Sequence, residues 1–370
     1  MSANIRPAGT FDTNYKQDIA INRTPMSRLL VNGLFVALLI LPLLSREGPF
    51  GLNIVPIAFI GTIINIAIFA IAVQGLNILM GYTGQISLGH AAFMAVGAYT
   101  AAIGSREAGI PFWLGIPLAG LVTGVIGLLF GLPSLRVKGF YLAMATLAAQ
   151  FIIPWIIRHP MAPITNGDKP IEVPTPMLGP LNFTSDAAYF YVVVPLAVLM
   201  FFLARNIMRT RVGRAFVSIR DNDLAAELLG INIFRYKLLA FFISSVYAGV
   251  AGALAAYDTQ SVNIHSYELL YSIQMLAMLV LGGAGFPLGP LFGAGFIILL
   301  TQNVIPAAAN VLKDVLPSLL PFISVVNIES SLRPFLFGFA LIAFLIIEPR
   351  GLAYRWEIFK IAWKIRPFSN

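Results

Sequence analysis

The sequence predicts an all-α polytopic membrane protein with about ten transmembrane segments, some of them short or broken, and with both termini in the cytoplasm. Of its 370 residues, 58% are hydrophobic and only 11% are charged, whereas soluble globular domains carry roughly 25% charged residues. The mean hydropathy of +0.84 leaves too few charges to cover a soluble domain of this size. The apolar runs are continuous rather than alternating, which favours helices over a β-barrel.

Ten apolar runs are the expected spans, because a helix needs roughly 20 apolar residues to cross the hydrocarbon core. They cover residues 29–44, 54–80, 86–103, 112–132, 140–158, 187–205, 237–257, 268–282, 288–305 and 333–348. The third, eighth and ninth runs are short or interrupted by glycine, so we expect some of them to be re-entrant or broken. Residues 1–28 are polar and lack the apolar core of a signal peptide. They form a cytoplasmic extension, 29–348 form the transmembrane domain, and 349–370 form a basic cytoplasmic tail.

Basic residues are distributed unevenly between alternate loops. Eighteen of the 24 Lys and Arg residues lie in loops on one face of the membrane, and six lie on the other. The richer face carries 1–28, 133–139, 205–237 and 349–370, together with the uncharged turns 81–85 and 283–287. Cytoplasmic loops are enriched in Lys and Arg, so this bias places both termini and residues 205–237 in the cytoplasm. Topology in a lipid bilayer thus accounts for the net charge of +8, and no nucleic-acid partner is needed.

Two loops on the opposite face are rich in proline and turn-forming residues. They cover residues 159–186 and 306–332. Such segments suit irregular, ordered caps over a pore mouth. Simple tethers between spans are an equally good interpretation.

The segment 205–237 is the long polar interruption that mixes basic, acidic and helix-forming residues, and it holds seven of the 24 Lys and Arg residues. Asp221 to Asp223 offer helix N-caps and negative charge at a helix start. Residues 224–229 are helix formers, and Gly230 is placed to end the helix in a left-handed conformation. Just before this helix, residues 212–220 predict a short amphipathic turn. Its apolar side comprises Ala215, Phe216 and Ile219.

A short capped helix of this kind suits force transmission to a soluble partner, since a flexible loop would absorb the force. The alternative is that the helix lies on the bilayer with its arginines on anionic headgroups. Asp221, Asp223 and Glu227 argue against that alternative, because the same surface would repel them.

Polar side chains inside the apolar runs are candidates for lining a pathway, because each is costly in a membrane unless it is paired or faces a cavity. Gln85, Ser87 and His90 cluster beside a glycine-rich break at residues 81–97, and a second such break covers 282–295. We assign these three side chains to a translocation pathway. An interhelical hydrogen bond is the alternative for each, and close helix packing is the alternative for the glycines.

Catalytic and metal-binding chemistry find little support in the sequence. The chain has no cysteine, which excludes thiolate chemistry and cysteine metal sites. The three histidines, His90, His159 and His265, are far apart in sequence and offer no metal-ligand spacing. No nucleophile elbow or cluster of His, Asp and Glu indicates an enzyme.

Residues Ala225, Ala226 and Gly230 form the pattern A-A-x-x-x-G, which is similar to the EAA loop of ABC importer permeases. The family's usual glutamate position is occupied by Leu224, and Asp223 and Glu227 are the nearest acids. The surrounding sequence is GRAFVSIRDNDLAAELLGIN followed by YKLLAFFISSVYAGVAGAL. It closely resembles the LivM-type permease subunit of branched-chain amino acid ABC transporters.

Further segments carry the same resemblance, which spans roughly residues 30–355 in matching order. GLNILMGYTGQISLGHAAFMAVGAY at residues 75–99 resembles the family's N-terminal hallmark. LGGAGFPLGPLFGA at 281–294 and IEPRGLA at 347–353 resemble its C-terminal ones.

The resemblance implies a permease in the bacterial inner membrane that forms half of a translocation pathway. Its partners would be a second homologous permease subunit, two cytoplasmic ABC ATPases and a periplasmic solute-binding protein. No G-x-x-x-x-G-K-[ST] phosphate loop occurs in the chain. We therefore expect it to bind no cofactor, with ATP used by the partner subunits. The expected ATPase-coupling residues are Arg220, Asp221, Asn222, Asp223, Ala225, Ala226, Glu227 and Gly230.

Other transport functions remain open. Relatives within the same family carry urea, short amides or aromatic acids, and the binding protein largely sets specificity in such systems. An ion-coupled secondary carrier is an alternative of a different class. It would want a carboxylate at mid-membrane, whereas Glu268 stands at the end of a predicted span.

Overall fold

The computed structural model describes residues 33, 39–45, 56–134, 140–179, 181–307, 328–348 and 350–365. Its long helices are α3 (Ile57–Leu76), α4 (His90–Glu107), α5 (Phe112–Ser134), α6 (Phe140–Arg158), α8 (Asp186–Arg209), α11 (Ile233–Thr259), α12 (Leu269–Gly282), α13 (Gly289–Leu299) and α15 (Ile328–Ile347). Shorter helices are α7 (Ala162–Thr165), α9 (Arg211–Asp221), α10 (Asp223–Leu228) and α16 (Leu352–Ile365).

Several short elements complete the described chain. The π-helical turns η2 (Asn77–Tyr82) and η4 (Leu300–Val304) continue α3 and α13, and η1 (Leu41–Leu44) and η3 (Ile264–Tyr267) are 3-10 turns. The strands are β1 (Ile171–Glu172), β2 (Met177–Leu178), β3 (Leu181–Asn182) and β4 (Ser261–Val262). β1 pairs antiparallel with β4, with Ile171 opposite Val262, and β2 pairs with β3.

Six described helices are long and apolar enough to cross a membrane. They are Ile57–Tyr82, Phe112–Leu132, Tyr141–Arg158, Asp186–Arg209, Ile233–Thr259 and Gly289–Ala307. The predicted all-α, multi-pass membrane protein is confirmed at this level.

Nine of the ten predicted spans coincide with helices of the described chain. The first, 29–44, lies largely outside the described residues, as do 1–28 and most of 133–139 and 306–332. The total of ten spans and the side of the membrane on which the termini lie stay predictions.

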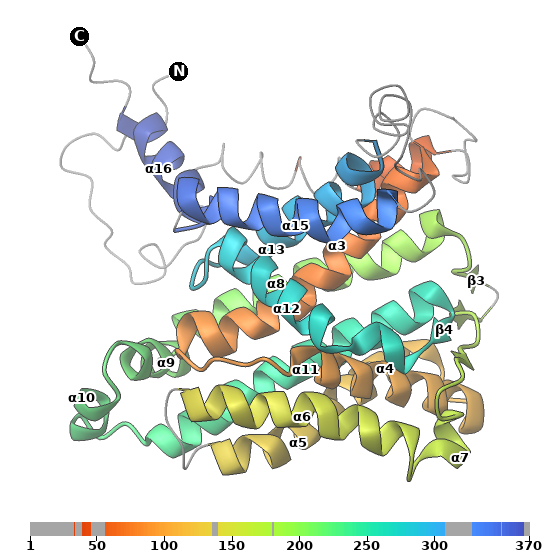
Figure 1. Ribbon diagram of the computed structural model, residues 1–370, viewed down its shortest axis with the longest axis horizontal. Coiled ribbons are helices and arrows are strands. Elements are labelled where there is room, and N and C mark those ends of the chain that lie inside the picture. The colour runs from red at the N-terminus through yellow and green to blue at the C-terminus, as the bar shows by residue number, and fades with distance from the viewer. Residues whose placement is uncertain are drawn as a thin grey trace.

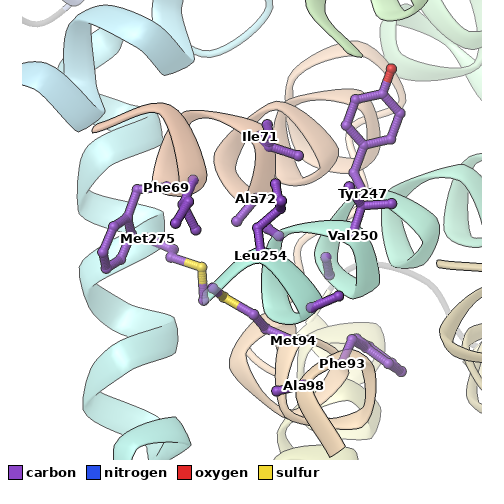
Figure 2. Packing of buried hydrophobic residues seen from close by; sticks show 14 of the residues in the cluster. Phe69, Ile71, Ala72, Phe93, Met94, Ala98, Tyr247, Val250, Leu254 and Met275 are labelled. Atoms are coloured by element: carbon purple, nitrogen blue, oxygen red, sulfur yellow. The ribbon is translucent and has the colours of Figure 1, made fainter. Parts of the chain in front are cut away.

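α11 runs through the middle of the bundle and contacts α3, α4 and α5. Figure 2 shows Leu254 of α11 between Ala72 of α3 and Met94 of α4, and all three residues are buried. Lipid tails are as apolar as leucine, so helices in a membrane gain most from close packing through small residues.

Glycines allow the backbones of α4 and α11 to touch. A Cβ atom added at Gly252 of α11 would collide with the carbonyl oxygen of Met94, and one at Gly97 of α4 would collide with the carbonyl oxygen of Gly249. For Gly97, which belongs to the first glycine-rich break, the close-packing interpretation is therefore correct.

The two ends of the bundle carry different elements. Figure 1 shows α9 and α10 at one end and α7, β3 and β4 at the opposite end. We call these the α10 end and the β4 end. α11 joins them, and its 27 residues span about 40 Å at the usual 1.5 Å rise per residue.

Candidate functional site

The candidate site lies at the α10 end and begins with α9. An N-terminal cap and a buried apolar face hold α9 in place. The hydroxyl of Thr210 accepts a hydrogen bond from the Val212 N–H at 3.2 Å, which satisfies one of the free donors at the helix start. The predicted apolar side is confirmed, because it is buried in the bundle. It comprises Ala215, Phe216 and Ile219.

α10 follows directly and is capped at both ends. The Asn222 side chain accepts a hydrogen bond from the Ala225 N–H at 3.0 Å. Gly230 has φ +82° and donates its N–H to the Glu227 carbonyl at 2.9 Å, so a left-handed residue ends the helix as predicted. Of the three predicted N-cap candidates, Asn222 takes the role, so the helix predicted over 221–230 begins at Asp223 rather than at Asp221. Asp221 is the last residue of α9, because the extended Asn222 separates the two helices.

α10 presents apolar side chains outward. Leu224, Leu228 and Leu229 are 62%, 90% and 80% exposed. On the inner side Ala226 is buried, and Asp223 forms an ion pair with Lys237 at 3.8 Å, which ties α10 to the start of α11. Ala225 and Glu227 are exposed. Exposed leucines beside acids indicate a surface for a protein partner more than one for an anionic membrane.

Arg220 connects α9 to the first glycine-rich break. Its Nη1 donates a hydrogen bond to the carbonyl oxygen of Gly81 at 3.0 Å, and its Nε donates to Oδ1 of Asp221 at 3.0 Å. Gly84 has φ +70°, and a Cβ atom added there would lie 3.2 Å from Cγ of Arg220. Glycine at position 84 therefore allows both the turn and the close approach of the arginine.

Asn77 connects the first break to the second. Its Oδ1 accepts from the N–H of Gly285 at 2.8 Å, and its Nδ2 donates to the carbonyl oxygen of Phe286 at 3.0 Å. The side chain is fully buried. One amide thus satisfies two backbone groups that have no water to bond with.

The C-terminal motif at residues 347–353 also contacts the second glycine-rich break. A Cβ atom added at Gly351 would lie 2.5 Å from Cα of Gly283, and the rings of Phe286 and Tyr354 are 6.2 Å apart between centroids. We call this assembly the glycine hub. It comprises Asn77, residues 81–84, Arg220, residues 283–286 and Gly351.

The hub brings together segments that the sequence predicts on one face of the membrane. Their basic residues predict this side for 205–237 and 349–370, and alternation of the spans predicts it for the uncharged turns 81–85 and 283–287. In the structure, described parts of all four segments meet at the hub.

The amide of Asn77 is expected to stabilise the hub. Replacing Asn77 with leucine, which branches at Cγ in the same way but cannot form hydrogen bonds, should lower the free energy of unfolding by about 2–4 kcal/mol, because a buried donor and a buried acceptor would each lose a partner. Thermal unfolding in detergent measures this. The matched control is Asn303→Leu in the other π-helical turn, where the side chain is exposed; an equal loss in both variants would contradict the assignment.

The three predicted pathway residues are all buried within the chain. Gln85, Ser87 and His90 are 2%, 2% and 1% exposed, and none of them lines the three cavities of about 550, 280 and 400 Å³ in the described part of the chain. His90 Nε2 lies 2.9 Å from the carbonyl oxygen of Ala72. Gln85 donates to the Thr83 hydroxyl at 3.0 Å. The interhelical hydrogen bond thus holds for His90, and the pathway role of the three stays a prediction.

The helix break before α4 is possible because polar side chains from other helices accept hydrogen bonds from the free N–H groups at the start of α4. The Ser272 hydroxyl accepts from the Ala91 N–H at 2.8 Å, and Oε1 of Gln150 accepts from the Ala92 N–H at 3.0 Å. Such bonds let an irregular backbone persist at membrane depth.

The described part of the segment 159–186 is ordered and includes α7 and the strands β1 to β3. β1 of this segment pairs with β4. Arg158 and His265 each approach Asp168, at 3.3 and 3.6 Å, and Nδ1 of His265 lies 3.2 Å from Glu268. The strand pairing and the contact between Asp168 and His265 therefore hold this segment against the chain that follows α11. Within the described residues no group of three or more His, Cys, Asp or Glu side chains is arranged to hold a metal.

The sequence of the chain is similar to known permease proteins over most of its length. Residues 58–344 match the family model described as "Branched-chain amino acid transport system / permease component". The high-affinity branched-chain amino acid transport system permease protein LivM of Salmonella typhimurium is 33% identical over 271 residues, which is 67% of this chain and 62% of the relative. LivM of Escherichia coli is 32% identical with the same coverage.

A more distant relative is the probable branched-chain amino acid transport permease protein LivM of Methanocaldococcus jannaschii, with 25% identity over 65% of this chain and 71% of the relative. The match thus spans 62% of the length of the two bacterial relatives. No solved structure matches the chain. The family match covers well over half of the chain, and the protein belongs to the branched-chain amino acid transport system permease component family.

Proposed function

We propose that this chain is the transmembrane permease subunit of an ATP-driven importer for branched-chain amino acids. The observation that carries the proposal is the contact of α9 with both glycine-rich breaks. α10 presents exposed leucines to a partner, and Arg220 at the end of α9 contacts the hub inside the bundle. A displacement of α10 by an ATPase is thereby transmitted to the helix breaks.

The partners follow from the same proposal. A second homologous permease subunit completes the pathway, two cytoplasmic ABC ATPases bind at the α10 end, and a periplasmic solute-binding protein docks at the β4 end. The protein lies in the bacterial inner membrane with ten spans, and both termini and residues 205–237 are cytoplasmic. The 18 basic residues on one face support this orientation.

Reconstitution tests the function against an ion-coupled carrier. Proteoliposomes are prepared with the chain, its partner permease, the ATPases and the binding protein. They should take up leucine, isoleucine or valine only when ATP is present on the side of the membrane where the ATPases lie. The chain reconstituted alone should show no uptake driven by a proton or sodium gradient. Gradient-driven uptake by the chain alone would reject the proposal. Calorimetry of the binding protein with urea, short amides and aromatic acids tests the other substrates.

The exposed leucines of α10 are expected to hold the ATPase. Leu228→Asp should weaken ATPase binding about tenfold or more, since a fully desolvated apolar anchor at an interface is worth roughly 2 kcal/mol. Co-purification at graded salt, or biolayer interferometry with the ATPase, measures the loss. The matched control is Leu178→Asp at the β4 end, also an exposed leucine. Equal binding by wild type and Leu228→Asp would remove α10 from the interface.

A further inference from the structure

A small polar cavity opens at the β4 end of the bundle, between α3, the end of α11, η3 and the start of α12. Its volume is about 280 Å³, slightly below the roughly 300–1,000 Å³ of pockets for drug-sized ligands. Residues that line it include Asn65, Phe69, Asp258, Asn263, Ser266 and Tyr271. Two larger cavities among the described residues, of about 550 and 400 Å³, are almost wholly apolar.

Asp258 gives this cavity a negative field. It is partly buried in the last turn of α11, where the free carbonyl groups of the helix end already carry partial negative charge. Asp186 at the start of α8 adds a second negative charge that acts on it. Asp258 takes part in none of the ion pairs among the described residues. A carboxylate in this position is destabilised by its surroundings, so the cavity favours a positively charged guest.

The other polar groups select the kind of cation. A divalent metal prefers six or more oxygen ligands with several carboxylates, and the described residues offer no such group here. The remaining polar side chains are neutral donors. Asn263 accepts from the His265 N–H through Oδ1 at 3.1 Å, which leaves its NH₂ group to donate. Together with the Ser266 hydroxyl, it can bind a carboxylate.

One wall of the cavity is apolar. The rings of Phe69 and Tyr271 are 5.2 Å apart between centroids, and Ile68 lies beside them. The cavity therefore combines one carboxylate, several neutral donors and an aromatic wall. These match the ammonium, carboxylate and branched side chain of a single amino acid.

We propose that this cavity receives the amino acid at the β4 end, with its ammonium group against the carboxylate of Asp258 and its side chain against Phe69 and Tyr271. The inference rests on the proposed function and adds to it a receiving site within the permease itself. Neutral donors for the substrate carboxylate keep binding weak, so the substrate is released onward.

Saturation-transfer NMR on the purified membrane complex in nanodiscs, without binding protein or ATP, tests the site. At millimolar concentration, L-leucine and isopentylamine should both give signals, and 4-methylpentanoate, which lacks the amine, should give a much weaker one. Asp258→Asn should reduce the leucine and isopentylamine signals about tenfold, the loss expected for one charged hydrogen bond. The control is Glu172→Gln, an exposed carboxylate in β1 opposite Ser261, which should bind as wild type.

Three outcomes overturn the site: no leucine signal in the wild type, an unchanged signal in Asp258→Asn, or equal signals from leucine and 4-methylpentanoate. ATP-driven uptake by the same wild-type complex separates the two proposals. If the wild type takes up branched-chain amino acids while Asp258→Asn binds leucine normally, the proposed receiving site is wrong and the importer function stands. If the wild type hydrolyses ATP and takes up no branched-chain amino acid, both proposals are wrong.

A folding control is needed for Asp258→Asn. An unfolding temperature within a few degrees of that of the wild type excludes misfolding as the cause of a lost signal.

Discussion

Replacing Arg220 with alanine should reduce ATP-driven uptake about tenfold while the ATPases still bind and hydrolyse ATP. The guanidinium group is the link between α9 and the first glycine-rich break, through its hydrogen bond to the Gly81 carbonyl. Hydrogen bonds to charged groups are worth about 1.5–3 kcal/mol. The lower value applies here because the side chain is 38% exposed, and about 1.4 kcal/mol corresponds to a factor of ten. Uptake and ATP hydrolysis are measured in the same proteoliposomes.

A matched variant separates this link from the general loss of a charge. Arg214 lies on the exposed side of the same helix, so Arg214→Ala should leave the ratio of uptake to ATP hydrolysis unchanged. Arg220→Lys should give an intermediate ratio, since an ammonium group does not reproduce the planar fork of guanidinium donors. If Arg220→Ala lowers uptake and hydrolysis in equal proportion, the residue does not couple them.

Local structure at the α10 end could be predicted from the sequence because its signals are local. An asparagine before a run of helix formers acts as an N-cap, and a glycine after the run ends the helix. Both Asn222 and Gly230 take these roles. The exact position of the break between α9 and α10 does not follow from the sequence, because Asp221, Asn222 and Asp223 can each cap a helix. Only the extended conformation of Asn222 distinguishes them.

The glycine hub could not be predicted in the same way. Asn77 and Gly285 are 208 residues apart, and one sequence contains no signal that pairs them. The sequence does show an amide inside an apolar run and a glycine-rich turn, but Asn65 is also such an amide and bonds within its own helix, to the carbonyl oxygen of Gly61. Which polar group crosses between segments depends on helix rotation.

For the predicted pathway residues, too, the sequence shows that a polar side chain needs a partner but not which partner it has. The cost of a polar group in a membrane correctly predicts that Gln85 and His90 need partners or a cavity, and His90 has a backbone partner. The sequence does not single out Asp258, because it follows an apolar run and resembles an ordinary helix-end residue. Its significance comes from the lining of the cavity by α3, η3 and α12, which the sequence does not place together.

Replacing Gly252 with leucine should prevent stable assembly of the helix bundle. An added Cβ atom would collide with the carbonyl oxygen of Met94, and this obstacle is backbone of α4, which cannot turn away as a side chain can. Inserting bulk into a well-packed core typically costs about 1–3 kcal/mol. We expect more than about 3 kcal/mol here, because α11 would have to separate from α4 along the contact that centres the bundle. The yield of monodisperse protein in detergent and its unfolding temperature measure the effect.

The same change at Gly295 of α13 is the control, since outside its own helix turn no atom of the described residues lies within 4 Å of an added Cβ there. Gly295→Leu should therefore give protein in wild-type yield, with an unfolding temperature close to that of the wild type. A difference between the two variants isolates backbone contact from the lost flexibility of glycine, because both glycines stand inside helices. If Gly252→Leu folds as well as Gly295→Leu, α4 and α11 do not pack through their backbones, and α11 would not be a rigid connection between the α10 end and the β4 end.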